Sequence, residues 1–247
     1  MSTRTIVGVG VGPGDPGLLT VRAVEALRGA GAVLAPAPRR GGESLALAIA
    51  RPYLPEDCGA HTAHFPMTED PEALSAAWDE AAATLLRLAG AGSPAVFITL
   101  GDAMLYSTWS YVIAAVRRAD PAADVRTVPG VTAMSACAAA VGHPLAEGRE
   151  PLLVWPDEPP ADAAALLSLA PNVVFMKAGR HLEELARMAE EAGAQAVAVS
   201  RASQAGARVT HDLRAWTGDQ DYFTTVLMRR TGRDPLGTAP RRDEARP

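Results

Sequence analysis

Short apolar runs alternate with amphipathic helical patterns through the first half of the chain, as in repeated βα units. The run at 95–100 is apolar throughout, which is typical of a parallel strand covered on both faces. Asp70 followed by Pro71 marks a helix start, and apolar residues then recur at 74, 78, 81, 85 and 88. We expect strands at 6–11, 32–34, 95–100 and 125–128, and further helices at 18–28, 44–50, 107–118 and 131–141. The pattern predicts an open, mostly parallel α/β sheet.

The second half repeats the alternation less regularly. Strands are expected at 152–155, 173–176 and 196–200, with helices at 162–169 and 182–192. Two later strands, at 208–213 and 222–229, are expected to pair antiparallel, which predicts a mixed-sheet α+β domain. The segment 142–148 has the composition of a linker. We therefore predict domains at 1–145 and 146–230 and a disordered tail at 231–247.

Composition narrows the class of protein. Hydrophobic residues make up 48% of the 247 residues and charged residues 21%, which is ordinary for a globular protein. A net charge of −5 gives no support for nucleic-acid binding. The N-terminus does not resemble a signal peptide, no apolar run is long enough to span a membrane, and two cysteines are too few for a disulfide framework. We expect a cytoplasmic protein with no membrane partner.

A glycine-rich turn follows the first strand. Gly12, Gly14 and Gly17 match the bare spacing of a dinucleotide-binding loop. Pro13 and Pro16, however, remove two N–H donors that would hold a pyrophosphate. The second expected strand also ends at residues 35–36, an alanine and a proline, where an acidic ribose ligand is expected. A dinucleotide loop and a turn without a ligand stay open as alternatives.

Two more segments occupy strand ends. Residues 99–107 follow an apolar strand and contain Gly101 and Asp102, and residues 129–133 follow the next strand and contain Thr132. In open α/β sheets this edge is where ligands bind. Asp102 and Thr132 are each expected either to cap the following helix or to face a ligand, and the two roles are compatible.

Taken together, the three segments resemble the tetrapyrrole methylases in order and spacing. The resemblance runs from 6 to about 229 and includes the Leu-Leu-Thr helix start at 18–20. Residues 99–108 and 174–177 are similar to the branch that methylates C20 of precorrin-2, although Ala103 stands where the family usually has proline. The resemblance implies a two-domain fold, with a mostly parallel N-terminal α/β sheet and a mixed-sheet α+β C-terminal domain. It also implies a homodimer.

The family uses S-adenosylmethionine and releases S-adenosylhomocysteine, and the resemblance places this cofactor between the domains. It implies direct displacement at the methyl carbon, with no covalent intermediate and no metal on the protein. It assigns cofactor contacts to Pro13, Gly101, Asp102, Leu105, Thr132, Ala133, Met176 and Ala202. The tetrapyrrole substrate carries several carboxylates, for which bidentate cations are suited. By position, the expected substrate contacts are Lys177, Arg180, Arg39 and Arg40. The sequence identifies no general base.

Other functions stay open. Within the same chemistry, the alternative substrate is cobalt-factor II of the anaerobic route. A more distant alternative is an NADP-dependent oxidoreductase in which Arg39 and Arg40 take the 2′-phosphate. A third is a tetrapyrrole- or nucleotide-binding module without turnover.

Isolated histidines and cysteines give weaker signals. His61 and His64 are spaced like a metal pair but have no third ligand nearby, so a solvated loop is favoured. Cys137 lies among alanines without an activating neighbour, which indicates packing rather than catalysis.

Overall fold

A computed structural model describes residues 4–37, 39, 42–90, 93–156, 158–160, 163–216 and 221–230. The chain divides into two compact units. The first comprises Met1–Ala136 and Arg201–Ala207, and the second comprises Cys137–Ser200 and Arg208–Pro247. The predicted domain boundary near residue 145 stays a prediction, and the tail at 231–247 lies outside the described residues.

The first unit is built on a five-stranded parallel sheet with the strand order β3-β2-β4-β1-β5. Its central strand, β4, is buried along its whole length, as its continuous apolar sequence requires. The parallel sheet expected from the alternating pattern is confirmed. Its strands are β1 (Thr5–Gly10), β2 (Ala32–Ala37), β3 (Gly59–His64), β4 (Ala95–Thr99) and β5 (Asp124–Val128).

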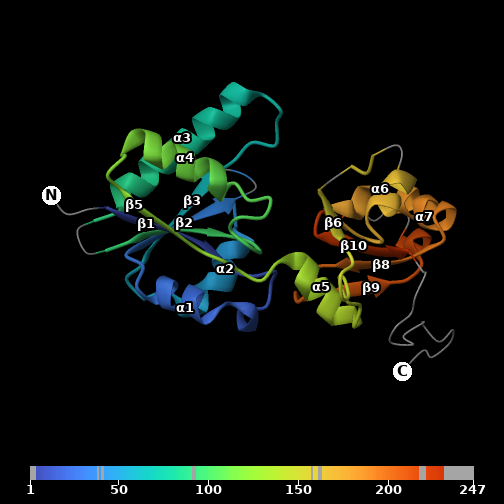
Figure 1. Ribbon diagram of the computed structural model, residues 1–247. Coiled ribbons are helices and arrows are strands. Elements are labelled where there is room, and N and C mark those ends of the chain that lie inside the picture. Colours follow the sequence, from blue (N-terminus) through green and yellow to red (C-terminus); the bar gives the residue numbers. More distant parts are fainter. Residues whose placement is uncertain are drawn as a thin grey trace. The chain divides into compact units, whose positions relative to one another are not determined.

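Helices cover both faces of this sheet (Figure 1). On one face, α1 (Val21–Arg28) and α2 (Leu45–Ala50) pack on apolar side chains of β1, β2 and β4. On the other face, α3 (Pro71–Leu88) and α4 (Trp109–Ala119) enclose a second core around Phe97 and Trp109. No helix in the described part of the chain is both long and apolar enough to cross a membrane.

The predicted helix starts are confirmed by their caps. The Thr20 side chain accepts a hydrogen bond from the N–H of Ala23, and Asp70 accepts one from Glu72. Such caps satisfy backbone donors that have no partner within the helix. Within the predicted stripe of α3, Ala81 and Leu85 are buried, and Trp78 stacks on Tyr111 of α4 with ring centroids 4.4 Å apart. The stripe therefore joins α3 to α4.

Two predictions for this unit were wrong. β2 does not stop at its first proline but continues to Ala37. Beyond Leu34 it pairs with β3 alone, so the missing N–H of Pro36 interrupts no ladder on the other side. The segment containing His61 and His64 is not a loop but the edge strand β3.

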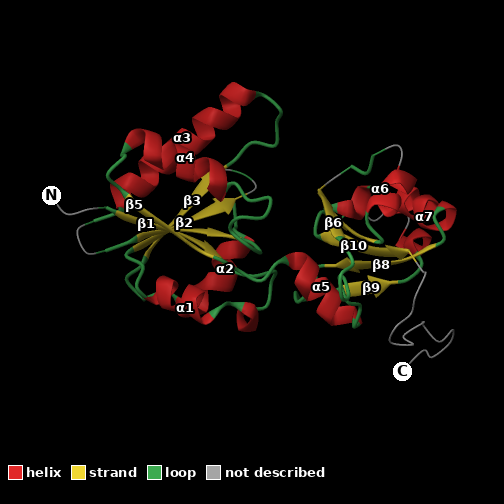
Figure 2. Ribbon diagram, in the orientation of Figure 1, coloured by secondary structure: helices red, strands yellow, loops and turns green. Residues whose placement is uncertain are grey.

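The second unit contains a mixed sheet with the order β6-β7-β10-β8-β9 (Figure 2). β6 and β7 are parallel, and the remaining pairs are antiparallel. The mixed sheet is confirmed, but β9 and β10 do not pair with each other, because β8 lies between them. The strands are β6 (Leu152–Pro156), β7 (Asn172–Met176), β8 (Ala194–Ser200), β9 (Arg208–Thr210) and β10 (Thr224–Arg230), and the helices are α6 (Ala163–Leu169) and α7 (Leu182–Glu191). The boundary between the units falls within α5 (Ala133–Val141), whose residues from Cys137 onward belong to the second unit.

A partly buried ion-pair network fixes the segment before β6. The Arg229 side chain is only 11% exposed and lies 2.6 Å from a Glu147 oxygen and 3.2 Å from a Glu150 oxygen. Asn172 donates a hydrogen bond to Glu150, and this bond lowers the pKa of the Glu150 carboxyl. Glu147, in the segment expected to be a linker, is therefore attached to β10, and Glu150 just after it is attached to both β7 and β10.

The close packing of Trp109 against Gly8 gives a stability prediction. Trp109 is fully buried, stacks on Phe97 and donates its indole N–H to Thr127 at 2.9 Å. A Cβ added at Gly8 would lie 2.1 Å from the indole ring. We expect Gly8→Ala to lower the free energy of unfolding by about 1–3 kcal/mol through overpacking, as measured by urea denaturation.

The matched control is Gly29→Ala, because the nearest atom to a Cβ there is 3.6 Å away. We expect its unfolding free energy to stay the same or rise slightly. Equal stability of Gly8→Ala and the wild type would contradict the packing argument.

Candidate functional site

The order of the strands creates a topological switch point between β1 and β4. The connection from β1 runs through α1 past β4 to β2, whereas the connection from β4 runs through α4 past β1 to β5. The two crossovers therefore leave neighbouring strands in opposite directions. Ligands of open α/β sheets bind outside the carboxyl ends of the strands at such a point. The loops after β1, β4 and β5 are thus the candidate site of the first unit.

Backbone hydrogen bonds join the first two of these loops. The N–H of Val11 donates to the carbonyl of Thr99 at 2.9 Å. Gly12 and Gly101 then exchange two bonds, of 3.1 and 2.7 Å, in an isolated antiparallel bridge. Backbone hydrogen bonding between β1 and β4 thereby extends beyond the parallel strands into the loops, where the chains run antiparallel. The backbone of both loops is fixed before any ligand arrives.

The Asp102 carboxylate connects the second loop to the third. One oxygen accepts the N–H of Met104 at 2.8 Å, and the other accepts the N–H of Gly130 at 2.9 Å. Hydrogen bonds to a charged acceptor are about twice as strong as neutral ones. Asp102 is therefore a clamp between the loops after β4 and β5. The expectation that it caps the following helix was wrong, because α4 begins only at Trp109, with Thr108 at its N-cap position.

The glycines of this edge allow the loops to touch one another. A Cβ at Gly130 would lie 2.2 Å from the carbonyl oxygen of Gly101 and 2.7 Å from that of Gly10. Only glycine permits so close an approach of three backbones. The space that a side chain of Gly130 would need is occupied by the protein's own backbone.

An arm of the chain, residues 201–207 between β8 and β9, packs on the glycine-rich turn. Gln204 donates its side-chain N–H to the carbonyl of Pro13 at 2.8 Å, and the N–H of Asp15 donates to the Ser203 hydroxyl at 3.3 Å. A Cβ at Gly14 would lie 2.2 Å from Cγ of Gln204. The arm also places the buried Ala202 beside this turn.

The third loop leads directly into α5. The Thr132 hydroxyl accepts the N–H of Ser135 at 3.3 Å and lies 2.8 Å from the Ser135 hydroxyl. The expected cap is confirmed. Pro13, Gly101, Asp102, Leu105, Thr132, Ala133 and Ala202 thus all belong to the first unit, at or beside one edge of its sheet.

The charge and topology of this edge disfavour a dinucleotide. Residues 11–18, 100–108 and 129–132 contain no lysine or arginine, and their acidic residues are Asp15 and Asp102. Such loops suit an uncharged or cationic nucleoside better than a pyrophosphate. In dinucleotide-binding sheets β2 lies beside β1, whereas here β4 separates them. The end of β2 is therefore not positioned to supply a ribose ligand to the glycine-rich turn.

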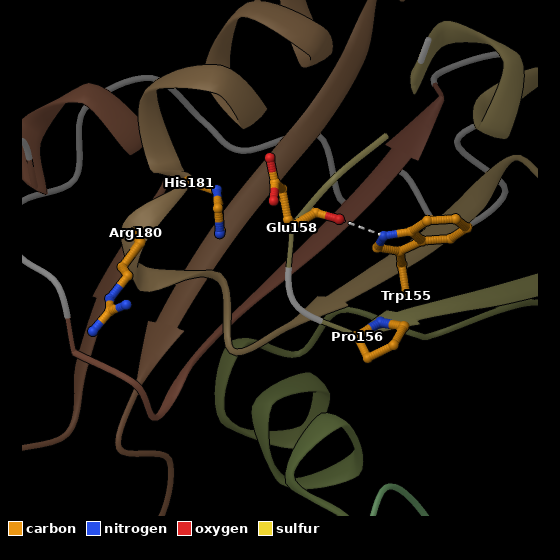
Figure 3. Close-up of a pocket in the computed structure, with 5 residues that line it drawn as sticks. All are labelled: Trp155, Pro156, Glu158, Arg180 and His181. Atoms are coloured by element: carbon orange, nitrogen blue, oxygen red, sulfur yellow. Dashed lines mark hydrogen bonds between the residues drawn. The ribbon is translucent and has the colours of Figure 1, made fainter. Parts of the chain in front are cut away.

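The remaining predicted residues lie elsewhere. Met176 ends β7 in the second unit, and its part in cofactor binding stays a prediction. Lys177 adopts a left-handed conformation (φ 58°), with its ammonium group 5.5 Å from the centre of the Tyr222 ring. Arg180 is exposed and lines a pocket of the second unit (Figure 3). Arg39 is exposed beyond the end of β2, and Arg40 lies outside the described residues.

The histidines and cysteines do not form a site. Within the described residues, no group of three His, Cys, Asp or Glu side chains is arranged to hold a metal ion, so His61 and His64 remain a pair on an edge strand. Burial raises the pKa of Cys137 to about 11, and its thiol is neutral at physiological pH. Burial likewise lowers the pKa of His143.

Sequence reasoning missed Ser203 and Gln204. They follow β8 by only a few residues, yet they bind the turn after β1. Neither belongs to a recognisable motif, and the segment around Ala202 matched the expected pattern poorly. Only the family resemblance pointed to this region.

A family comparison identifies the family of the chain. The sequence pattern of the Tetrapyrrole (Corrin/Porphyrin) Methylases matches residues 5–215. The chain belongs to this family. The loops at the switch point, and the arm at 201–207, all lie within the matched region of this tetrapyrrole methylase.

Two relatives of this methylase are similar over nearly their whole length. The cobalt-precorrin-2 C(20)-methyltransferase of Salmonella typhimurium is 37% identical over 228 residues, which cover 90% of this chain and 95% of that protein. The precorrin-2 C(20)-methyltransferase of a Sinorhizobium species is 31% identical over 235 residues, which cover 90% of this chain and 94% of that protein.

A solved structure shares the fold. The uroporphyrin-III C-methyltransferase of Thermus thermophilus, complexed with S-adenyl homocysteine, has a TM-score of 0.63 and 20% identity, and the match covers 91% of this chain and 97% of that one. The two-domain fold expected from the resemblance is confirmed.

The clamp made by Asp102 gives a binding prediction. Asn at this position keeps one acceptor oxygen but turns an N–H donor toward Met104 or Gly130. We expect Asp102→Asn to raise the Kd for S-adenosylhomocysteine about tenfold or more, because a hydrogen bond to a charged group is lost. Calorimetric titration measures this change.

The control is Asp120→Asn. Asp120 accepts a backbone N–H from Ala122 and a hydrogen bond from Arg4, far from this edge, just before β5 begins. Its Kd should equal that of the wild type. Unchanged binding by Asp102→Asn would show that the clamp does not shape the site.

The arm gives a second prediction. Gln204→Met preserves the length of the side chain and its contact with Gly14 but removes the donor to Pro13. We expect the Kd for S-adenosylhomocysteine to rise about three- to tenfold, the effect of one neutral hydrogen bond. Gln195→Met, on the exposed part of β8, is the matched control and should bind normally. A Gln204→Met variant that binds like the control would refute a positioning role for the arm.

Proposed function

We propose that this methylase transfers a methyl group from S-adenosylmethionine to C20 of precorrin-2 during cobalamin biosynthesis. The carrying observation is the similarity to two C20-methyltransferases across 90% of the chain. The arrangement of the loops supports the same assignment, since their backbone is fixed at a switch point and they carry no cation for a pyrophosphate.

Most of the residues that would hold the cofactor are gathered in the first unit, and Met176 of the second unit remains a further candidate. Pro13, Gly101 and Leu105 offer backbone and apolar surface, and Thr132, Ala133 and Ala202 flank them. Asp102 adds a carboxylate, which attracts a cationic sulfur. When bound, S-adenosylmethionine supplies a methyl group on a positively charged sulfur that leaves as a neutral thioether.

The chain's own contribution is alignment. The loops after β1, β4 and β5 are held by backbone bonds, by the Asp102 carboxylate and by the arm. A preformed site of this kind orients the reactants before reaction, and orientation alone contributes up to about 7–11 kcal/mol. The electron-rich C20 carbon of the substrate would attack the methyl carbon as the C–S bond breaks, and a proton would then be lost from C20 or a ring nitrogen to a base. No side chain of these loops is required to form a covalent bond.

Substrate binding needs cations, because precorrin-2 carries several carboxylates. Lys177, Arg180, Arg39 and Arg40 remain our candidates for these contacts. A homodimer and a cytoplasmic location also remain part of the proposal. They rest on the family resemblance and on the sequence analysis, respectively.

A second substrate is favoured by one observation. The Salmonella relative, at 37% identity, is named for cobalt-precorrin-2 rather than for the metal-free compound. Both substrates present the same C20 carbon. We therefore propose that metal-free precorrin-2 and its cobalt complex be assayed side by side, by the transfer of a labelled methyl group to each.

The cofactor class is tested by calorimetric titration with S-adenosylhomocysteine and, separately, with NADPH. We expect micromolar binding of the first and none of the second, because the loops at the switch point lack the donors and cations that a dinucleotide phosphate requires. Binding of NADPH alone would overturn the methyltransferase assignment. Binding of S-adenosylhomocysteine without methylation of either tetrapyrrole would instead leave a binding module.

A further inference from the structure

The second unit contains a pocket of about 570 Å³, lined by Trp155, Pro156, Glu158, Arg180 and His181 (Figure 3). Its volume is within the range of small-molecule sites. Trp155 and Pro156 end β6, and Arg180 and His181 follow β7. The pocket therefore lies at the carboxyl end of the parallel pair β6–β7, where Pro156 is the strand partner of Met176.

One wall of the pocket is flat and apolar. The indole N–H of Trp155 donates to the backbone carbonyl of Glu158 at 2.7 Å (Figure 3). This bond satisfies the only polar atom of the indole and fixes its ring. Pro156 adds a second apolar ring beside it in the same view. A planar, uncharged group can pack against this wall.

The opposite wall carries a cation on a rigid turn. In the part of the chain that the structure describes, the Arg180 guanidinium makes no ion pair. Gly179 is packed so closely that a Cβ would lie 2.2 Å from the carbonyl oxygen of Asp221, and Leu182 is buried. The backbone on both sides of Arg180 is therefore fixed, and five N–H donors are presented to a ligand.

Glu158 restricts the class of ligand. In Figure 3 it lies between the two walls, so the pocket carries one acceptor carboxylate as well as the guanidinium. A simple anion would be repelled by Glu158. A ligand that bears both an N–H donor and a carboxylate on a flat ring satisfies all three features.

We propose that this pocket binds one pyrrole-type ring of the tetrapyrrole substrate together with its acid side chain. The guanidinium of Arg180 forms a bidentate pair with the side-chain carboxylate. Glu158 accepts a ring N–H, and Trp155 and Pro156 pack against the ring. This inference rests on the proposed function and assigns it a substrate subsite.

Methyl-transfer kinetics test the subsite, with the tetrapyrrole that the wild type methylates. We expect Arg180→Gln to raise the KM for the tetrapyrrole about tenfold or more and to leave the Kd for S-adenosylhomocysteine unchanged. Arg180→Lys keeps the positive charge but cannot form a bidentate pair with a carboxylate, so it should recover only part of the affinity for the tetrapyrrole. Arg187→Gln is the control, since Arg187 is exposed on α7 and pairs with Glu191.

An esterified substrate distinguishes the contribution of the carboxylate charge from that of the fit of the ring. The methyl ester of the tetrapyrrole should bind wild type and Arg180→Gln equally, because the carboxylate has been neutralised. S-adenosylmethionine also carries a carboxylate, and a rise in the Kd for S-adenosylhomocysteine in Arg180→Gln would identify that group as the ligand and overturn the proposal.

Two further outcomes distinguish failure of the subsite from failure of the proposed function. An unchanged tetrapyrrole KM in Arg180→Gln, with an active wild type, would refute the subsite alone. A wild type that binds S-adenosylhomocysteine and methylates neither tetrapyrrole would refute the proposed function and, with it, this choice of ligand.

Discussion

The close approach of three loop backbones, bridged by the Asp102 carboxylate, is the constraint on which the rest of the first unit depends. Gly130 fits only because it has no Cβ, which would lie 2.2 Å from the carbonyl oxygen of Gly101 and 2.7 Å from that of Gly10, and Asp102 then accepts its N–H. The strands behind these loops must be parallel and in this order for the contact to exist. The bridge thereby converts the topology of the sheet into a fixed surface for a ligand.

Local sequence signals predicted most of the first unit. The caps at Thr20 and Asp70 and the apolar run of β4 depend on neighbours in the chain, so they are readable without a structure. β3 was missed because it is an edge strand in which small and polar residues are mixed with histidines, and its pairing with β2 carries no local signature. The extension of β2 through Pro36 depends on the same non-local pairing.

The same contrast between local and non-local signals explains why only part of the site was predicted. Asp102 and Thr132 follow strands directly, so their position at the sheet edge follows from the fold. Ser203 and Gln204 reach the glycine-rich turn across 188 and 191 residues, and no spacing rule anticipates such a contact. Likewise β9 and β10 are consecutive strands, yet β8 separates them. Insertion of a strand between sequence neighbours is a property of the completed sheet.

The placement of β4 between β1 and β2 bears on how cofactor use can change. Point substitutions can alter the glycine-rich turn, but they cannot bring the end of β2 beside it. Conversion of this fold into a dinucleotide-binding enzyme would require a different strand order, with β2 beside β1. Neither random mutagenesis nor the grafting of loops changes the order of strands in a sheet. The family can therefore diversify in its tetrapyrrole substrates while its nucleoside ligand stays the same, and engineering efforts have most freedom on the substrate side.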